Sequence, residues 1–334
     1  MIKVAINGFG RIGRLATRML ADSPDLQLVA INSNGPVESS AYLFKYDSSY
    51  GTWNGTVETK PNMMIINHKE IRYSQEKEPQ NLPWADLGVE MVIDCTGIFT
   101  EKQKALLYQQ VGVKKVLLSA PGKHEDVTLV MGVNEEMYDP KNHYLISNAS
   151  CTTNCLAPVA KVLQDKFGIE KGFMTTIHSY TNDQNILDKS HKDLRRARAA
   201  ALSIIPTTSG ATKALASVLP ALKGKMDGLA LRVPTPTVSI VDLVVDTVKP
   251  VTVKSVNAAF EEAAAGDLKG ILTVSHDPIV SIDLKGSDYS AIVDAPLTMV
   301  MGTNQVKVLA WYDNEWGYTC RLCDMAAFIA RKGL

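Results

Sequence analysis

The strongest chemical signal in the sequence is a short segment rich in hydroxyl, amide and thiol groups, Ser147-Asn148-Ala149-Ser150-Cys151-Thr152-Thr153-Asn154-Cys155. It stands between a strand-like run and an apolar run with helical spacing, so Cys151 is expected at a helix N-terminus. Free N–H groups and the helix dipole stabilise a thiolate there. The position predicts Cys151 as a nucleophile, with a buried thiol as the alternative. Cys155, one turn further in, is expected to be buried and inert.

A thiol nucleophile needs a base or an imidazolium partner, and that partner can be distant in sequence. His178 lies on a strand candidate, in the run Thr175-Thr176-Ile177-His178-Ser179-Tyr180. A lone histidine is more often structural or exposed, and this is our expectation for the other five of the six histidines.

A second site is indicated by the spacing Gly8-x-Gly10-x-x-Gly13, which follows a strand pattern directly and opens a helical one. The first glycine permits a tight turn, the second lets the backbone approach a pyrophosphate, and the third allows helix and strand to pack closely. The helix N-terminus then supplies N–H groups to the phosphates. The motif predicts a dinucleotide site; a flexible turn is the alternative.

The end of the second strand bears on which dinucleotide is bound. NAD sites usually place an acidic residue there, on the ribose hydroxyls. This chain has Asn32, Ser33 and Asn34 instead. Because a carboxylate is absent and hydroxyl and amide donors are present, the strand end favours tolerance of the 2′-phosphate of NADP. The alternative is that NAD binds without that contact.

Bulk composition excludes several classes of protein. Lys plus Arg and Asp plus Glu both number 35, so the net charge is zero, and neither nucleic acid nor an anionic membrane is an expected partner. No apolar run is long enough to span a bilayer, and the N-terminus lacks an export pattern. We therefore expect a complete cytoplasmic chain. Cys320-x-x-Cys323 could suggest zinc, but no matching second pair exists, and we expect buried thiols and no metal site.

The elements that must position these residues change in type near Asn148. Before it, short strands alternate with helices, which predicts a parallel sheet with crossover helices. After it comes a helix, then longer strands that suggest a largely antiparallel sheet covered by helices. The strands are expected at 2–6, 26–31, 91–94, 116–119, 172–180, 229–248, 271–275, 292–301 and 306–312. The helices are expected at 12–20, 152–167, 211–222, 253–265 and 315–332.

This change and the length of 334 residues predict two domains. Residues 1–150 form the dinucleotide-binding domain, to which the C-terminal helix, 315–334, is free to return. Residues 151–314 form the second domain.

Six collinear motifs resemble glyceraldehyde-3-phosphate dehydrogenases. They are NGFGRIGR, SNASCTTNCLAP, IHSYTNDQ, DLRRARAAA, RVPTP and WYDNEWGY, and they span the whole chain at the expected spacing. The resemblance implies an α/β fold with a Rossmann-type, doubly wound parallel sheet and an α+β catalytic and oligomerisation domain. It also implies a homotetramer.

The implied reaction is the oxidation of glyceraldehyde 3-phosphate, with inorganic phosphate, to 1,3-bisphosphoglycerate. Cys151 would form a hemithioacetal and then a thioester, and His178 would act as acid and base. Further roles follow by similarity. The substrate phosphate would be bound by Thr181, Asp183 and Arg232, and inorganic phosphate by Ser150, Thr152, Arg196, Ser209 and Gly210. The cofactor would be bound by Gly8, Phe9, Gly10, Arg11, Ile12, Gly13, Asn32, Ser33, Lys77, Thr96, Gly97, Ser119, Lys189, Ser190 and Asn314.

Two positions depart from the pattern of the NAD-linked members. Ser33 stands where they carry Asp, and Lys189-Ser190 stands where they carry Leu-Pro, in a loop that a tetrameric neighbour brings to the adenosine ribose. Photosynthetic members that use NADP resemble this chain at Ser190. We therefore expect NADP to be used, alone or alongside NAD, with a neutral loop substitution as the alternative.

Two other functions remain open from the sequence. An erythrose-4-phosphate dehydrogenase would share the fold and the nucleophile. A non-catalytic binding protein could share the scaffold, because a fold does not fix a function.

Overall fold

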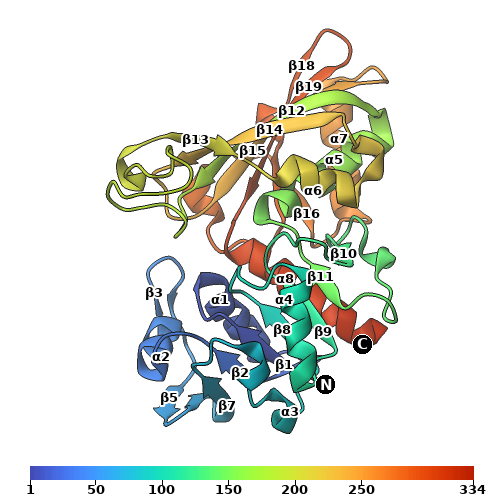
Figure 1. Cartoon of the computed structure of the whole chain (residues 1–334). Helices are drawn as coiled ribbons and strands as arrows, with labels where there is room; N and C mark the ends of the chain where they lie inside the picture. Colours follow the sequence, from blue (N-terminus) through green and yellow to red (C-terminus); the bar gives the residue numbers. More distant parts are fainter. The chain divides into compact units, whose positions relative to one another are not determined.

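The chain divides into two units in the computed structural model, which describes all 334 residues. The first unit contains Met1–Leu129, Glu135–Ser150 and Thr319–Leu334, and the second contains Val130–Asn134 and Cys151–Tyr318 (Figure 1).

The first unit is built on a nine-stranded sheet with the order β10-β11-β9-β8-β1-β2-β7-β6-β5. Its strands are β1 (Ile2–Asn7), β2 (Leu26–Asn32), β5 (Val57–Lys60), β6 (Met63–Ile66), β7 (Lys69–Ser74), β8 (Met91–Asp94), β9 (Lys115–Leu118), β10 (Val127–Thr128) and β11 (Leu145–Ser147). A small separate hairpin joins β3 (Tyr46–Asp47) and β4 (Gly51–Thr52). The α-helices before the C-terminal one are α1 (Arg11–Leu20), α2 (Val37–Lys45), α3 (Trp84–Leu87) and α4 (Lys102–Ala105), and a 3-10 helix follows α4 at Leu106–Val111.

The central strands of this sheet are parallel, as the alternating pattern predicts. They read as continuous apolar runs because both of their faces are buried. The last residues of β1, β2 and β8 lie in register across the sheet, Asn7 opposite Asn32 on one side and Asp94 on the other. The carboxyl ends of these strands therefore form one polar edge, which is where open α/β sheets bind ligands.

One edge of the sheet was not predicted. Strands β5, β6 and β7 form an antiparallel meander that extends the parallel core beyond β2. Their turns use Asn62, Asn67 and His68 with positive φ. Pro61-Asn62 and Asn67 are turn-forming residues, so the hairpins carry a sequence signal that the strand assignment above did not use.

The C-terminal helix α8 (Trp316–Lys332) begins one residue later than expected, and from Thr319 it belongs to the first unit. Its last turn makes an ion pair, Arg331 Nη1 to Asp25 Oδ2 at 2.5 Å. Phe328 packs edge-on against Tyr138, whose hydroxyl donates to the carbonyl of Gly333.

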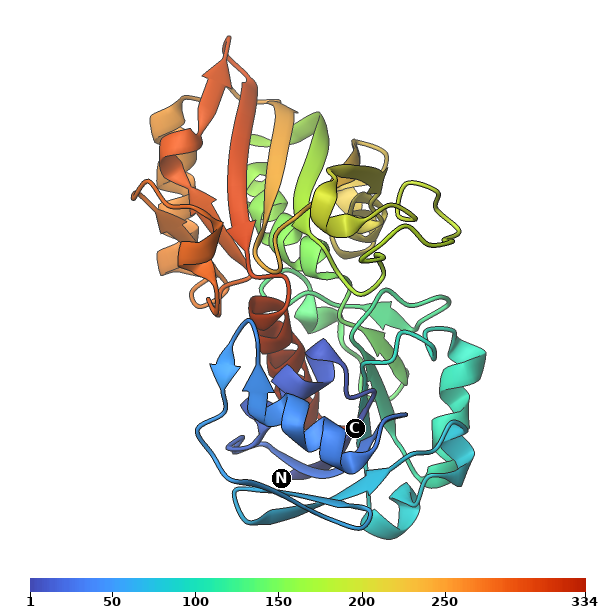
Figure 2. The same ribbon diagram turned by 90° about the vertical axis from the view of Figure 1, so that its left-hand side faces the viewer.

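The second unit is built on an eight-stranded, largely antiparallel sheet with the order β13-β14-β12-β15-β19-β17-β16, and β18 pairs with β19. Its strands are β12 (Ile169–Ser179), β13 (Ile205–Thr208), β14 (Met226–Val233), β15 (Ser239–Thr247), β16 (Leu272–Ser275), β17 (Ala291–Asp294), β18 (Met299–Met301) and β19 (Gln305–Tyr312). Its helices are α5 (Cys151–Phe167), α6 (Ala211–Val218) and α7 (Val253–Ala265). The long strands of this sheet, coloured green to red, lie side by side in Figure 2. The predicted fold class is confirmed.

The sheet is buried on one face and open on the other. Along β12, Met174, Thr176 and His178 are buried, whereas Phe173 points to the opposite face and is 73% exposed. The apolar helix α5 packs against β12, β15 and β19. Because neighbouring residues of a strand point to opposite faces, this register sends His178 to the side of α5.

Three predicted elements are wrong in extent. The strand expected at 229–248 is two strands, because Pro234 and Pro236 interrupt pairing and the chain passes from one side of β12 to the other. The strand expected at 292–301 breaks at Pro296 into β17, a 3-10 turn and β18. The helix expected at 211–222 ends at Val218, because the residue before Pro220 disfavours helical backbone.

Candidate active site

The predicted nucleophile and its partner are brought together within the second unit. Cys151 is the first residue of α5, and His178 is the penultimate residue of β12. The distance from Cys151 Sγ to His178 Nε2 is 3.4 Å. Ala149, which bends the chain just before the helix, has a φ of 54°, a conformation that is uncommon for a residue other than glycine. Ser150 follows it in the first unit and directly precedes the cysteine.

Arg232 is the third member of this cluster. β12 and β14 are parallel, and their register places Arg232 directly beside His178. Arg232 Nη1 lies 2.7 Å from His178 Nδ1 and 3.0 Å from the carbonyl oxygen of Ser179. His178 Nδ1 lies 2.6 Å from the same carbonyl oxygen. A protonated Nδ1 therefore donates to the Ser179 carbonyl, whereas an unprotonated Nδ1 accepts from Arg232.

The protein environment keeps this pair uncharged. Burial, followed by the positive charge of Arg232, lowers the pKa of His178 to about 3. Burial also raises the pKa of the Cys151 thiol, against the opposing effects of Arg232 and Thr152. The direction of the Cys151 shift is opposite to the stabilised thiolate that its place at the helix start predicts. Cys155 is fully buried with a pKa well above its usual range, as expected for an inert thiol.

Tyr312, at the end of β19, supports both reactive groups and was not predicted. Its hydroxyl lies 2.9 Å from Thr152 Oγ1 and 2.8 Å from Thr176 Oγ1. Its ring meets the His178 imidazole edge-on, with ring centroids 6.0 Å apart. The residue belongs to the WYDNEWGY motif, but only the pairing of β15 with β19 shows that it lies on the same face as His178.

Arg196 belongs to a closed ring of hydrogen-bonded and paired polar groups. Its Nη1 pairs with Asp183, and its Nε donates to Thr207 Oγ1 at 3.0 Å. Thr207 in turn donates to Asp193 Oδ2 at 2.7 Å. The backbone N–H of Asp193 donates to His191 Nδ1 at 2.9 Å, and His191 Nε2 lies 3.5 Å from Asp183 Oδ1. Burial opposes ionisation of Asp183, but Arg196 outweighs it and holds the pKa of that carboxyl below its usual value.

This ring brings together residues that were predicted to bind different phosphates. Asp183 and Arg196, expected to bind different phosphates, are partners in the structure. The backbone N–H of Thr181 donates to Gln184 Oε1 at 3.3 Å. Ser209 and Gly210 lie at the N-terminus of α6, where Ser209 Oγ accepts from Ala211 N.

The remaining predicted residues of the second unit lie in its loops. Asn314 is buried after β19, and its Oδ1 accepts from Ser239 Oγ at 2.9 Å. Lys189 and Ser190 lie in the exposed loop after β12, where the N–H of Lys189 donates to the carbonyl of Ala197.

The first unit carries a groove of about 460 Å³ at the carboxyl ends of β1, β2 and β8. Seven of the predicted cofactor residues line it: Gly8, Phe9, Gly10, Asn32, Ser33, Lys77 and Thr96. Five other predicted cofactor residues of the first unit do not line it: Arg11, Ile12, Gly13, Gly97 and Ser119. Arg11 pairs instead with the buried carboxylate of Asp47, Nη1 to Oδ2 at 2.5 Å.

The glycines of the motif fit a bound dinucleotide. A Cβ on Gly13 would lie 2.1 Å from the carbonyl oxygen of Gly8, so only glycine lets α1 approach β1 so closely. Gly8 has a φ of +91°, which side chains rarely adopt. A Cβ on Gly10 would meet no protein atom within 4 Å, which leaves the backbone there open to a ligand. The residues present therefore fit the dinucleotide site that the sequence predicts.

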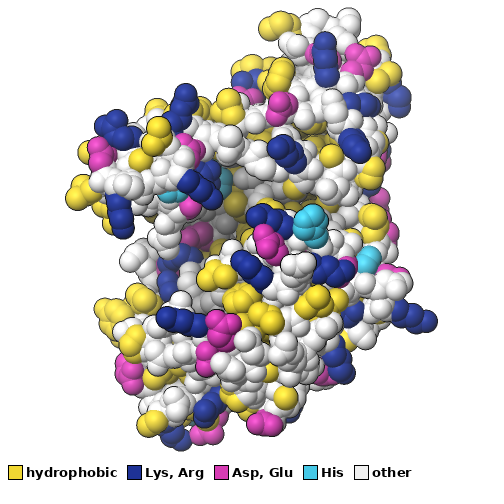
Figure 3. All heavy atoms as spheres, in the orientation of Figure 1, with side chains coloured by type: hydrophobic (Ala, Val, Ile, Leu, Met, Phe, Trp, Pro, Cys, Tyr) yellow, Lys and Arg dark blue, Asp and Glu magenta, His cyan; other side chains and the backbone are white.

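Three further properties bear on other classes of function. No group of three or more His, Cys, Asp or Glu side chains is arranged to hold a metal ion. No helix is both long and apolar enough to cross a membrane. Positive and negative side chains are interspersed on the face shown in Figure 3.

Comparison with known proteins places the chain in one family. Residues 2–102 match the family model "Glyceraldehyde 3-phosphate dehydrogenase, NAD binding domain", and residues 150–314 match the C-terminal domain of the same enzyme. A glyceraldehyde-3-phosphate dehydrogenase of Geobacillus stearothermophilus is 56% identical, with 100% of this chain and 99% of that protein aligned. Glyceraldehyde-3-phosphate dehydrogenase 1 of Bacillus cereus is 57% identical over 100% of both chains. Glyceraldehyde-3-phosphate dehydrogenase 2 of Trichormus variabilis is 54% identical over 99% of both. The chain therefore belongs to the glyceraldehyde-3-phosphate dehydrogenase family.

Proposed function

We propose that this protein oxidises glyceraldehyde 3-phosphate with inorganic phosphate to 1,3-bisphosphoglycerate through a thioester on Cys151. The observation that carries the proposal is the 3.4 Å approach of Cys151 Sγ to His178 Nε2 at the start of α5. A thiol at a helix N-terminus beside an imidazole is the arrangement that nucleophilic catalysis requires.

The chemistry follows from the state of the two groups. His178, neutral because of its low pKa, accepts the thiol proton as the sulfur attacks the aldehyde carbon. The resulting hemithioacetal carries an oxygen that the backbone N–H of Cys151 and the imidazole stabilise. His178 returns the thiol proton to this oxygen, which becomes a hydroxyl, and accepts it again as the carbon is oxidised to the thioester. Inorganic phosphate then attacks the thioester carbon, and Cys151 leaves as a thiolate that takes its proton back from His178. The dinucleotide, when bound, supplies the hydride acceptor.

We propose that the two phosphates are bound by different arginines. Arg232, beside His178, serves the substrate phosphate together with Thr181. Its buried Nε has no hydrogen-bond partner within the protein and is a free donor. Arg196 serves the attacking phosphate, helped by hydroxyl and backbone groups of Ser150, Thr152, Ser209 and Gly210. Asp183, which pairs with Arg196, orients that guanidinium and links the two phosphate sites.

For the cofactor, we propose that residues 1–150 and the helix 315–334 form the dinucleotide-binding domain. Ser33 and Lys77 lie on the same groove and can donate to a 2′-phosphate. We therefore propose that NADP is used well alongside NAD, with Lys189 and Ser190 contributing from a neighbouring subunit and Asn314 orienting the nicotinamide amide. Introducing Asp at Ser33 should shift the ratio of the two kcat/KM values toward NAD. An unchanged ratio would reject the assignment.

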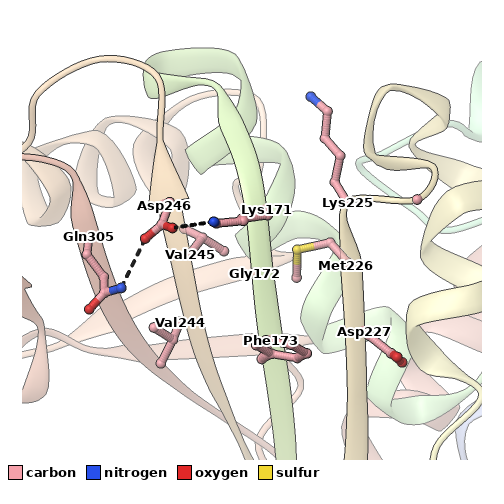
Figure 4. Close-up of a pocket in the computed structure, with 11 residues that line it drawn as sticks. Lys171, Gly172, Phe173, Lys225, Met226, Asp227, Val244, Val245, Asp246 and Gln305 are labelled. Carbon is pink, nitrogen blue, oxygen red and sulfur yellow. Dashed lines mark hydrogen bonds and ion pairs between the residues drawn. The ribbon is translucent and has the colours of Figure 1, made fainter.

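We further propose that residues 151–314 form the catalytic and oligomerisation domain of a homotetramer. The open face of its sheet supports this proposal. Figure 4 shows Phe173 beside Val244 on that face, in a hollow of about 630 Å³. Of the charged groups there, Lys171 pairs with Asp246, Lys225 donates to the carbonyl of Ile169, and Asp227 accepts from the N–H of Gly228. A face with an exposed aromatic ring and few free charges is suited to burial against a second copy.

The activity is tested by following NADH and NADPH formation from glyceraldehyde 3-phosphate, with and without phosphate. An increase in absorbance that requires phosphate supports the proposal, and Cys151→Ser should abolish this increase. Cys155→Ser is the matched control, because Cys155 is buried and should leave turnover within about twofold. Two results would favour an erythrose-4-phosphate dehydrogenase instead. They are turnover with erythrose 4-phosphate but not with glyceraldehyde 3-phosphate, and oxidation that does not require phosphate.

A further inference from the structure

A row of buried polar side chains lies under the dinucleotide groove, at positions where the sheet is otherwise apolar. The row consists of Asn32, Asn7 and Asp94, the last residues of three adjacent parallel strands. They are 5%, 3% and 2% exposed, respectively. Buried polar groups are costly unless they are bonded, so their presence in place of Val or Ile needs an explanation.

The row is bonded continuously from end to end. Asn32 Nδ2 donates to Asn7 Oδ1 at 2.8 Å. Asn7 Nδ2 donates to the hydroxyl of Tyr108 and lies 3.4 Å from Asp94 Oδ2. Tyr108 donates to Asp94 Oδ2 at 2.6 Å, and its ring is fixed by stacking on Trp84. Tyr108 therefore closes the row at the point where the direct Asn7–Asp94 contact is long.

Each end of the row holds one wall of the groove. At one end, Asn32 donates to the carbonyl of Glu76 at 2.8 Å and accepts from its N–H at 2.9 Å. At the other end, Asp94 Oδ1 accepts from Thr96 N at 2.9 Å and from Thr96 Oγ1 at 2.7 Å. Glu76 and Thr96 both line the groove. The loops that carry them are far apart in sequence, and the row connects them through the sheet.

The carboxylate of Asp94 is the centre of this arrangement. Burial raises its pKa, and the donors Tyr108, Thr96 and Asn7 oppose that effect. All four bonds run toward the carboxylate oxygens, so an isosteric amide in its place would have to turn an N–H group toward a donor.

We propose that Asp94 and Tyr108 are positioning residues for the cofactor, which lock the row Asn32–Asn7–Asp94 and so hold the Glu76 and Thr96 walls at the spacing a dinucleotide needs. The inference rests on the proposed use of this groove for NAD or NADP. Neither residue is proposed to touch the reacting atoms. Their effect is therefore on cofactor binding and not on the chemical step.

The test compares Tyr108→Phe and Asp94→Asn with Tyr144→Phe. Tyr144 packs against the same core cluster as Tyr108, and its hydroxyl donates at 3.3 Å to the carbonyl of Ala105 and to no residue of the row. The control thus removes a comparable hydroxyl without touching the groove. NAD and NADP dissociation constants are measured on the whole protein by calorimetry, and KM and kcat by steady-state assay.

We expect Tyr108→Phe and Asp94→Asn to raise the cofactor dissociation constants and KM by about 5- to 20-fold. We expect kcat at saturating cofactor and KM for the aldehyde to stay within about twofold, and Tyr144→Phe to leave all of them unchanged. Unchanged cofactor affinity in Tyr108→Phe, or an equal loss in Tyr144→Phe, would overturn the proposal. Tyr108→Phe alone decides the matter if Asp94→Asn does not fold. Because calorimetry needs no turnover, an inactive protein with these affinity changes would refute the proposed reaction and leave the inference standing.

Discussion

Replacing Arg232 with Gln should raise the pKa of His178, because the guanidinium is the second cause of the low value after burial. The pKa lies near 3, compared with an ordinary value of 6.5. Unit charges about 4 Å apart interact by about 4 kcal/mol at the effective dielectric of a protein surface, and each pKa unit corresponds to about 1.4 kcal/mol. That Coulomb energy would correspond to about 3 pKa units and is an upper bound, because burial is the larger cause of the shift. We therefore expect Arg232 to account for less than half of the depression, and the pKa of His178 to rise to about 4 in the variant.

The assay is an NMR titration of protein labelled at the histidine Cε1 carbon. The His178 resonance is assigned as the one that His178→Gln removes. The control is Arg198→Gln, because Arg198 makes only an exposed pair with Asp188 and should leave the titration unchanged. A His178 pKa that stays near 3 in Arg232→Gln would show that burial alone sets it, and the electrostatic reasoning would be wrong.

The other predictions concern the groove, the arginine ring and the tyrosine of the second unit. Gly13→Ala should weaken NAD binding at least tenfold, because its Cβ would lie 2.1 Å from the Gly8 carbonyl oxygen; calorimetry checks this. Asp193→Asn should raise KM for phosphate about 3- to 10-fold with KM for the aldehyde unchanged, because Asp193 holds Arg196 through a threonine. Tyr312→Phe should lower kcat about tenfold and reduce the melting temperature by a few degrees, because it leaves two buried threonine hydroxyls without their bond; equal kcat would contradict it.

The low pKa of His178 also predicts how stability depends on pH. The folded protein binds this proton only near pH 3, whereas the unfolded chain binds it near pH 6.5. The contribution of His178 to stability is therefore fully present above about pH 6.5 and is lost as the pH falls toward 3. Between neutral pH and pH 5, the melting temperature should fall less in His178→Gln than in the unmodified protein. An identical fall in melting temperature in both proteins would contradict the buried neutral histidine.

The sequence predicted those parts of the site that depend on a single element. The glycine spacing needs only a strand, a turn and a helix, and Cys151 needs only a helix start, so local pattern suffices for both. The parallel core strands could be predicted for the same reason, because their apolar runs are local. The strand expected at 229–248 shows the limit, since a run of strand-forming residues does not reveal that the chain changes sides of β12.

Contacts between distant strands could not be predicted from local pattern. Arg232 lies beside His178 only because β14 pairs in parallel with β12, and Tyr312 joins them only through the pairing of β15 with β19. The same limit applies to electrostatics. A cysteine at a helix start suggests a stabilised thiolate, but the degree of burial, which the sequence does not state, determines the direction of the pKa shift.

The hydrogen-bond partners of the two arginines bear on the proposed reaction. Arg196 is already paired with Asp183, and Arg232 already donates toward Ser179 and His178. In the proposed reaction, an incoming phosphate therefore competes with groups of the protein for Arg196 and for Nη1 of Arg232, whereas it meets the buried Nε of Arg232 without a partner. When a bound phosphate compensates the positive charge of Arg232, the electrostatic contribution of Arg232 to the low pKa of His178 becomes smaller. If the reaction proceeds as proposed, the imidazole then holds a proton more readily at the step in which it accepts one, and the phosphate of the substrate affects the base as well as binding.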